Sequence, residues 1–429
     1  MKKSLLLSLA AASMLAACNS NEDLGNVNDS ELAKQKIELG VSTNATVKTR
    51  GTGTVGGVEV DENKWDGQYL WVSMLEKGTM KPTQYVDPNG VGTVIYEDKL
   101  FKAPTTADNA GEKVQSGLAY ADDNSVAYYP VSGNSDFWGY RIDNAAGVAT
   151  QTPTVKLYNG ETETDNVEEA TRRVVDFTID GTQDIMTGKA KLADGEEDKL
   201  GARTDDYYSA YASRHGVQPN ITFDHQLTRF TFVVKAGSKS TAGNGDNTEA
   251  VSVTGLKLGS YTNGQLTVAY TGEAPESLIS FDKSGDMTML ELKERANADQ
   301  QNVELQPLTA KDLEWDDAEN KAVELPIGEA LLVSPSEVSY PLTINLEQPV
   351  VKSDDRNGNK VFETLELQQN VQLPEVVGGY LAGHSYVVTI TVYGLEKIEV
   401  TATLNPWVNG GNITIDEDAE NIFTPATQD

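Results

Sequence analysis

The stretch that decides the fold runs from Ile221 to Val234 and reads ITFDHQLTRFTFVV. Its apolar residues occupy the odd positions as far as Leu227 and the even positions from Phe230 onward. Alternation with a period of two is typical of a β-strand that buries one face. A change of phase within such a run indicates a bulge or bend, which we place near Thr228-Arg229.

The same period of two recurs along the chain and predicts an all-β, mainly antiparallel fold. Alternating runs lie at 37–47, 69–74, 126–129, 174–179, 266–270, 340–346, 386–392 and 398–404. Helical periodicity is weak, and its best candidates are 205–214 and 287–297. A chain of 429 residues is too long for one typical domain. We therefore expect two tandem β-sandwiches, over 51–220 and 221–429.

Composition and missing motifs exclude several classes of function. Acidic residues outnumber basic ones 65 to 34, which gives a net charge of −31, so attraction to nucleic acid is not expected. No nucleophile elbow, zinc-protease motif or phosphate-binding loop occurs, and His215, His225 and His384 are too scattered to suggest a metal site. We predict no enzymatic activity, no catalytic residue, no cofactor and no metal site. Because His225 shares a register with Phe223 and Leu227, we expect it to be buried and hydrogen-bonded.

The start of the chain resembles a bacterial lipoprotein signal peptide, residues 1–17. Lys2 and Lys3 precede an apolar run over 4–15, and Leu15-Ala16-Ala17-Cys18 follows, with Cys18 the only cysteine. The resemblance implies acyl chains such as palmitate on Cys18 and an anchor in the outer membrane. The alternative is an ordinary cleaved signal followed by a stray cysteine. Asn21-Glu22-Asp23 resembles an export signal for lipoproteins on the cell surface.

Three further segments resemble the fimbrillins, the type V pilins and related surface lipoproteins of Gram-negative gut and oral anaerobes. They are Phe223 to Phe230, Ala127-Tyr128-Tyr129-Pro130, and Leu381 to Tyr386 leading to Pro406-Trp407. The resemblance covers the whole chain. It implies two transthyretin-like β-sandwich domains, export as a lipoprotein, and cleavage by an arginine-specific protease. It also implies polymerisation by donor-strand exchange with other pilin subunits and with accessory or anchor fimbrial proteins.

The region 18–50 has the features that such a removable propeptide needs. Arg50 is the only arginine before Arg141, and Gly51 opens a glycine-rich stretch that suits a protease cleft. The strand expected at 37–47 presents five apolar side chains, Ile37, Leu39, Val41, Ala45 and Val47. At about 1.5–3 kcal/mol for each buried side chain, its loss would leave a groove costing on the order of 10 kcal/mol. A strand from a neighbouring subunit would fill that groove by β-augmentation.

The donor strand is expected in the tail, about 398–429. Ile398, Val400, Ala402 and Leu404 alternate, and Gly410-Gly411 offers a hinge before Ile413 and Ile415. The alternative is an intramolecular last hairpin followed by a frayed end.

These observations favour a structural subunit of a cell-surface fimbria that supports adhesion. The alternatives are a tip or accessory fimbrial adhesin, and an uncleaved surface lipoprotein that binds carbohydrate or a host protein. The acidic stretch 354–363 lacks the glycine of a calcium-binding EF-hand loop. Asn357-Gly358 instead predicts a hairpin between Val350-Val351 and Val361-Phe362.

Overall fold

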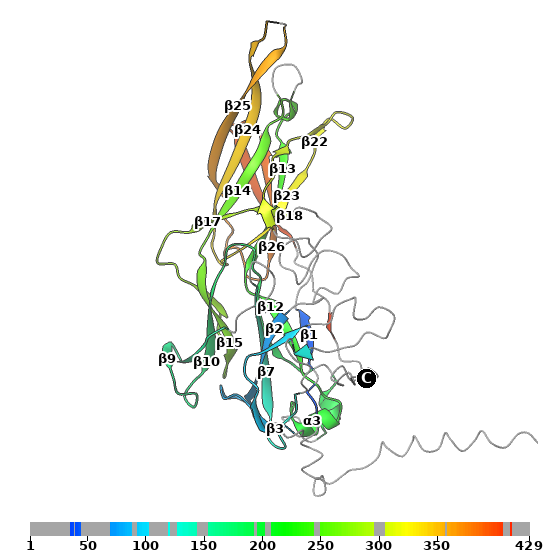
Figure 1. Ribbon diagram of the computed structural model, residues 1–429, viewed down its shortest axis with the longest axis vertical. Coiled ribbons are helices and arrows are strands. Elements are labelled where there is room, and N and C mark those ends of the chain that lie inside the picture. The colour runs from blue at the N-terminus through cyan, green and yellow to red at the C-terminus, as the bar shows by residue number, and fades with distance from the viewer. Residues whose placement is uncertain are drawn as a thin grey trace, which may run out of the picture.

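The computed structural model describes residues 35–37, 39–43, 69–87, 92–102, 119–120, 127–143, 153–192, 195–201, 207–243, 249–295, 305–356, 358–405 and 412–413. Strands make up most of the regular structure in these ranges (Figure 1). All but two of the strand pairings described below are antiparallel, so the expected all-β, mainly antiparallel fold is confirmed. The described helices are short: α2 (Glu197–Leu200), α3 (Ala210–Arg214) and the 3-10 turn η3 (Lys239–Ala242). None of the helices in these ranges has the length and apolar character needed to cross a membrane.

The N-terminal half is built on an eight-stranded sheet whose two faces are both buried. One face packs on a five-stranded sheet through a core that includes Trp71, Phe177 and Leu266. The opposite face carries a second core that includes Val72 and Phe223 and is covered by other segments of the same half. The large sheet has the order β28 (Asn412–Ile413), β1 (Gly40–Thr43), β12 (Asn220–His225), β11 (Ile185–Ala190), β7 (Ser135–Ile142), β2 (Tyr69–Glu76), β5 (Lys99–Lys102), β6 (Ala119–Tyr120). The smaller sheet has the order β16 (Ile279–Phe281), β15 (Asn263–Tyr270), β10 (Arg172–Thr178), β8 (Val155–Asn159), β9 (Thr162–Thr164), and β3 (Gln84–Asp87) pairs separately with β4 (Gly92–Ile95).

The C-terminal half consists of two sheets that bury one large core between them, with Phe230, Val388, Leu256 and Ile344 among its members. One sheet has the order β23 (Leu325–Val333), β13 (Thr228–Ala236), β26 (Ser385–Val392), β27 (Ile398–Asn405). The other has the order β17 (Thr288–Glu291), β14 (Ser252–Ser260), β24 (Pro341–Asp354), β25 (Lys360–Gln372), with β20 (Lys311–Asp312) also on β14. Two small hairpins complete this half, β18 (Lys293–Arg295) with β19 (Leu305–Pro307) and β21 (Trp315–Asp316) with β22 (Lys321–Ala322).

At two of the places where the chain crosses between the halves, the strands on either side are nearly continuous. Only Gln226 and Leu227 separate β12 from β13, and only Tyr261 and Thr262 separate β14 from β15. The division between the sheets therefore does not coincide with the predicted division between residues 220 and 221. β12, β15 and β16 complete the sheets of the N-terminal half, because β12 pairs with β11, β15 with β10, and β16 with β15. The change of phase in the alternating run from Ile221 to Val234 marks this passage from one sheet to another.

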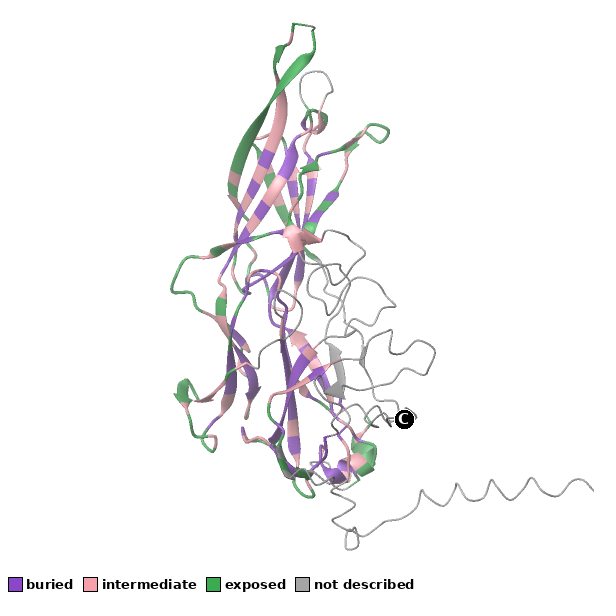
Figure 2. Ribbon diagram, in the orientation of Figure 1, coloured by how far each residue is buried: buried purple, intermediate pink, exposed green. Residues whose placement is uncertain are grey.

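Two further expectations can be compared with the structure. The described part of the helix candidate 287–297 instead contains β17 and β18, because Leu290 and Leu292 alternate toward the core. In the helix candidate 205–214, whose described part is 207–214, the described helix is α3. The hairpin expected at Asn357-Gly358 is confirmed: Val351 pairs with Phe362 on the long β24–β25 hairpin, which projects from the C-terminal half and is mostly exposed along β25 (Figures 1 and 2).

Candidate functional site

The segment that precedes β1 is tied into the N-terminal half by its backbone and by two apolar side chains. Ile37 and Leu39 are each 1% exposed and belong to the core on the outer face of the large sheet. The Ile37 N–H donates to the Ala127 carbonyl at 2.9 Å, and the Tyr129 N–H donates to the Gln35 carbonyl at 2.9 Å. These bonds form a short antiparallel bridge between Lys36 and Tyr128.

Side chains near α3 hold the same segment from another direction. The Ser213 hydroxyl donates to the Lys36 carbonyl at 3.2 Å, and the Gln218 side-chain amide donates to the same oxygen at 3.4 Å. Ser209 caps α3 by accepting a hydrogen bond from the Ala212 N–H, so the helix that carries Ser213 has a fixed start. Residues 35–37 are thus bonded to two separate parts of the N-terminal half.

β1 continues from this segment and lies inside the large sheet. It pairs in parallel with β12, with Val41 opposite Ile221 and Thr43 opposite Phe223. On its other side it pairs antiparallel with β28, where Val41 lies opposite Ile413. β1 therefore lies between β12 and β28, a short strand near the C-terminal end of the chain. In Figure 1 β1 lies beside β12, on the side of the N-terminal half away from β9, β10 and β15.

Several residues predicted for this site lie outside the described residues: Cys18, Ala45, Val47, Arg50, Gly51 and Ile415. Of Val41 and Ile413 the structure describes only the backbone. Four further tail residues lie in β27, which pairs with β26 from Ile398 to Asn405. Ile398, Val400 and Ala402 pack partly against the C-terminal core, and Leu404 is 56% exposed. They form the last hairpin of the C-terminal half.

The joint between the two halves is polar and buried. His225 is buried, as predicted, and its Nδ1 lies 3.0 Å from the Asp184 carboxylate. Arg229, at the start of β13, donates to the Ser385 hydroxyl at 2.9 Å, and burial lowers the pKa of its guanidinium to about 10. The Thr228 hydroxyl donates to the Leu381 carbonyl at 2.9 Å. The segments 223–230 and 381–386, which were singled out in the sequence as separate motifs, therefore meet at this joint.

No protein-family model matches the chain, and no curated protein sequence does. Solved structures do match over most of its length. A protein described as a cell adhesion protein from Bacteroides uniformis is 12% identical, with a TM-score of 0.39 over 87% of this chain and 98% of that one. The fimbrial anchor protein Mfa2 from Porphyromonas gingivalis is 11% identical, with a TM-score of 0.28 over 86% and 98%. A fimbrial assembly protein from Parabacteroides distasonis is 10% identical, with a TM-score of 0.30 over 86% and 98%.

Proposed function

We propose that this protein is a structural subunit of a cell-surface fimbria, and not an enzyme. It is exported as a lipoprotein held in the outer membrane through Cys18. An arginine-specific protease cuts after Arg50, and the trimmed subunit polymerises by donor-strand exchange and supports adhesion. The observation that carries the proposal concerns the segment upstream of Arg50: Ile37 and Leu39 lie in the core of the N-terminal half, and β1 pairs within its large sheet.

The energetics of that segment favour replacement once it is removed. Burial of Ile37 and Leu39 contributes about 1.5–3 kcal/mol for each side chain, so their loss alone exposes apolar surface worth about 3–6 kcal/mol. The edge of β12 that faces β1 would lose its backbone partners as well. An incoming strand satisfies both requirements, because its backbone pairs with β12 and its alternate side chains cover the core.

The donor in this proposal is the tail beyond β27. Asn412 and Ile413 pair with β1 in the precursor, so removal of β1 takes away the partner that these two residues have. A single cut would thus open an acceptor site and release the tail that fills the site of a neighbour. Ile398 to Leu404 would remain in the hairpin with β26.

The test is incubation of the purified, signal-free precursor with an arginine-specific protease. We expect a new N-terminus at Gly51 and a ladder of multimers on a denaturing gel run without boiling. The Arg50→Lys variant is the matched control, because it keeps the charge and should stay uncut and monomeric. Efficient cleavage at Arg50 without multimers would contradict the polymerising role and favour a tip adhesin or a binding lipoprotein.

The role of the tail is tested separately by deletion of residues 411–429. The deleted protein should still be cut after Arg50 but should form no ladder when it is alone. Mixed with the cleaved full-length protein, it should accept one donor and end the polymer. Ladder formation by the deleted protein alone would show that the donor lies elsewhere.

A further inference from the structure

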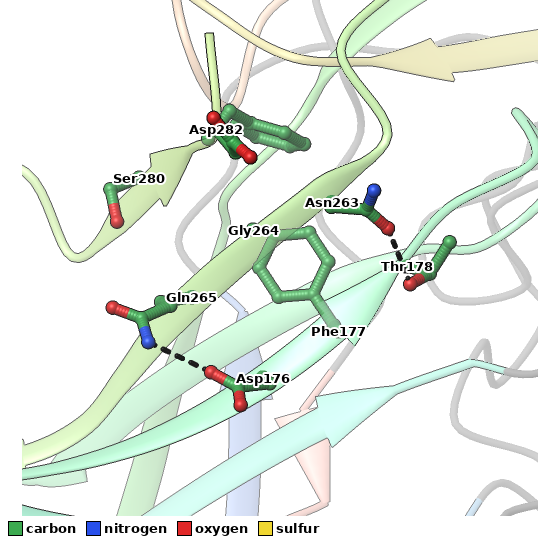
Figure 3. Close-up of a pocket in the computed structure, with 9 residues that line it drawn as sticks. Asp176, Phe177, Thr178, Asn263, Gly264, Gln265, Ser280 and Asp282 are labelled. Carbon is green, nitrogen blue, oxygen red and sulfur yellow. Dashed lines mark hydrogen bonds between the residues drawn. The ribbon is translucent and has the colours of Figure 1, made fainter. Parts of the chain in front are cut away.

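A shallow trough crosses the outer face of the five-stranded sheet, where β10, β15 and β16 lie side by side (Figure 3). Its volume is about 440 Å³, which is within the range of small-molecule sites, roughly 300–1,000 Å³. The register of the strands places two polar rows across the sheet. One row is Asp176, Gln265 and Ser280, and the other is Thr178, Asn263 and Asp282.

Gly264 lies between the two rows and leaves the floor of the trough to the backbone. Its cross-strand neighbour Phe177 is buried on the core side and packs directly beneath it. A Cβ atom at position 264 would lie 2.5 Å from the Phe177 ring, so no larger residue fits there. The Phe177 ring also meets Phe281 edge-on, with centroids 5.3 Å apart, which ties β10 to β16 beneath the floor.

Bonds within each row hold the polar groups in place. The Gln265 side-chain amide donates to Asp176 at 2.8 Å, and the Thr178 hydroxyl donates to the Asn263 side-chain oxygen at 2.9 Å. Asp282 accepts the Ser284 N–H at 2.9 Å. Among the described residues this leaves the Asn263 side-chain NH₂, the Gln265 side-chain oxygen and the Ser280 hydroxyl with no hydrogen-bond partner. The Asp282 carboxylate also keeps acceptor capacity.

We propose that this trough binds a saccharide through adjacent hydroxyl groups of a sugar ring. A sugar hydroxyl donates and accepts, and the trough offers donors and acceptors side by side on rigid strands. A cation fits less well, because Lys156 already pairs with Asp176 at 2.6 Å. The other carboxylate of the trough, Asp282, lies across from Asn263, whose side-chain NH₂ is a donor, and has no basic partner among the described residues. The neighbouring Lys283 is bonded to Glu337.

The trough faces away from the proposed assembly strand. The sheet that carries it covers one face of the large sheet, whereas Ile37 and Leu39 cover the other. Figure 1 shows β10 and β15 on the opposite side of the N-terminal half from β1. Saccharide binding therefore does not require cleavage or polymerisation. If the proposed fimbria forms, the site recurs in every subunit, and weak single contacts add up by multivalency.

The experiment is an NMR titration of the uncleaved precursor with the methyl glycosides of glucose, galactose, mannose and N-acetylglucosamine, each added separately. We expect at least one of them to bind with a Kd on the order of millimolar, as an open site with few contacts implies. Asn263→Ala and Asp282→Asn should each weaken that binding about tenfold, since each removes a hydrogen bond to the ligand. Asn159→Ala is the matched control, because Asn159 is exposed at the end of β8 in the same sheet, outside the trough.

Three outcomes would overturn the proposal: no glycoside binds, binding survives in both trough variants, or Asn159→Ala weakens it equally. A calcium chloride titration that shifts the signals of the trough while the glycosides do not would make it a cation site instead. All measurements use uncut protein, so a failure here is distinct from a failure of the protease experiment.

Discussion

Replacement of Leu39 by alanine tests whether the N-terminal segment is an integral part of the folded precursor. Leu39 is 1% exposed and lies in the same core as Val72 and Phe223. Truncation of a buried leucine removes its transfer free energy and leaves a cavity, which together cost about 2–5 kcal/mol. That is a large share of the roughly 5–15 kcal/mol by which a typical protein is stable.

The loss should appear in two measurements on the signal-free precursor. Urea unfolding should show a lower midpoint for the transition of the N-terminal half, where Trp71 and Trp138 are buried fluorescent reporters. Hydrogen exchange should accelerate at the amides of Ile37 and Tyr129, whose bonds close the bridge to this segment. Exchange in β26, in the core of the other half, should not change.

Leu365→Ala is the matched control, because this leucine is 43% exposed on β25. Its replacement should change the free energy of unfolding by no more than about 0.5 kcal/mol. If Leu39→Ala costs no more than Leu365→Ala, the segment contributes no core packing. The groove on which the assembly proposal depends would then have no energetic basis.

Three other perturbations have defined outcomes. Gly188→Ala should lower the free energy of unfolding in urea by about 1–3 kcal/mol or more, because a Cβ atom there would lie 2.0 Å from the Thr222 carbonyl oxygen. Gly285→Ala is the control and should be nearly neutral, because the space around Gly285 is open. Burial raises the pKa of Asp98, so its carboxyl group takes up a proton at a higher pH in the folded state than in the unfolded chain. The resulting stabilisation of the folded state is present at low pH and is lost as the pH rises through the folded pKa. As the pH falls from 7 toward the ordinary aspartate pKa of about 4, the urea midpoint of Asp98→Asn should therefore fall further, or rise less, than that of the wild type. Ser42→Pro should lower the free energy of unfolding by about 1–3 kcal/mol, because strands flank β1 on both sides and the N–H that proline lacks faces one of them. An unchanged urea midpoint would contradict the described pairing of β1.

Local alternation predicted the strands well but could not assign them to sheets. Ile221 and Phe223 were correctly read as the buried face of a strand, and His225 as a buried polar partner. Nothing in that run shows that the strand pairs with residues 185–190 and 40–43 rather than with the next strand along the chain. Pairing partners far apart in sequence decide the division between the halves, and a single sequence holds no record of them.

The two candidate sites differ in how far the sequence could predict them. Ile37 and Leu39 stand in an alternating run upstream of Arg50, the only arginine before Arg141, so the strand was expected from the alternation, and its removal was implied by the family resemblance. The trough escaped notice because its six polar side chains come from β10, β15, β16 and the residue after β16, and each of these strands alone has the ordinary polar outer face of a β-sheet. Gly264, two residues before the alternating run at 266–270, was a local signal of a close contact.

The near-continuity of β12 and β13 has a mechanical consequence. These two strands run one after the other through both halves of the molecule, and β1 lies parallel to β12 along four register pairs. Tension applied along the long axis would pull β1 and β12 past each other, so that the hydrogen bonds between them share the force instead of opening one after another. In the proposed fimbria, a donor strand in the place of β1 would be stretched in the same shear geometry. The joint between subunits would then resist the flow of fluid over the cell surface as well as the thermal loss of a subunit.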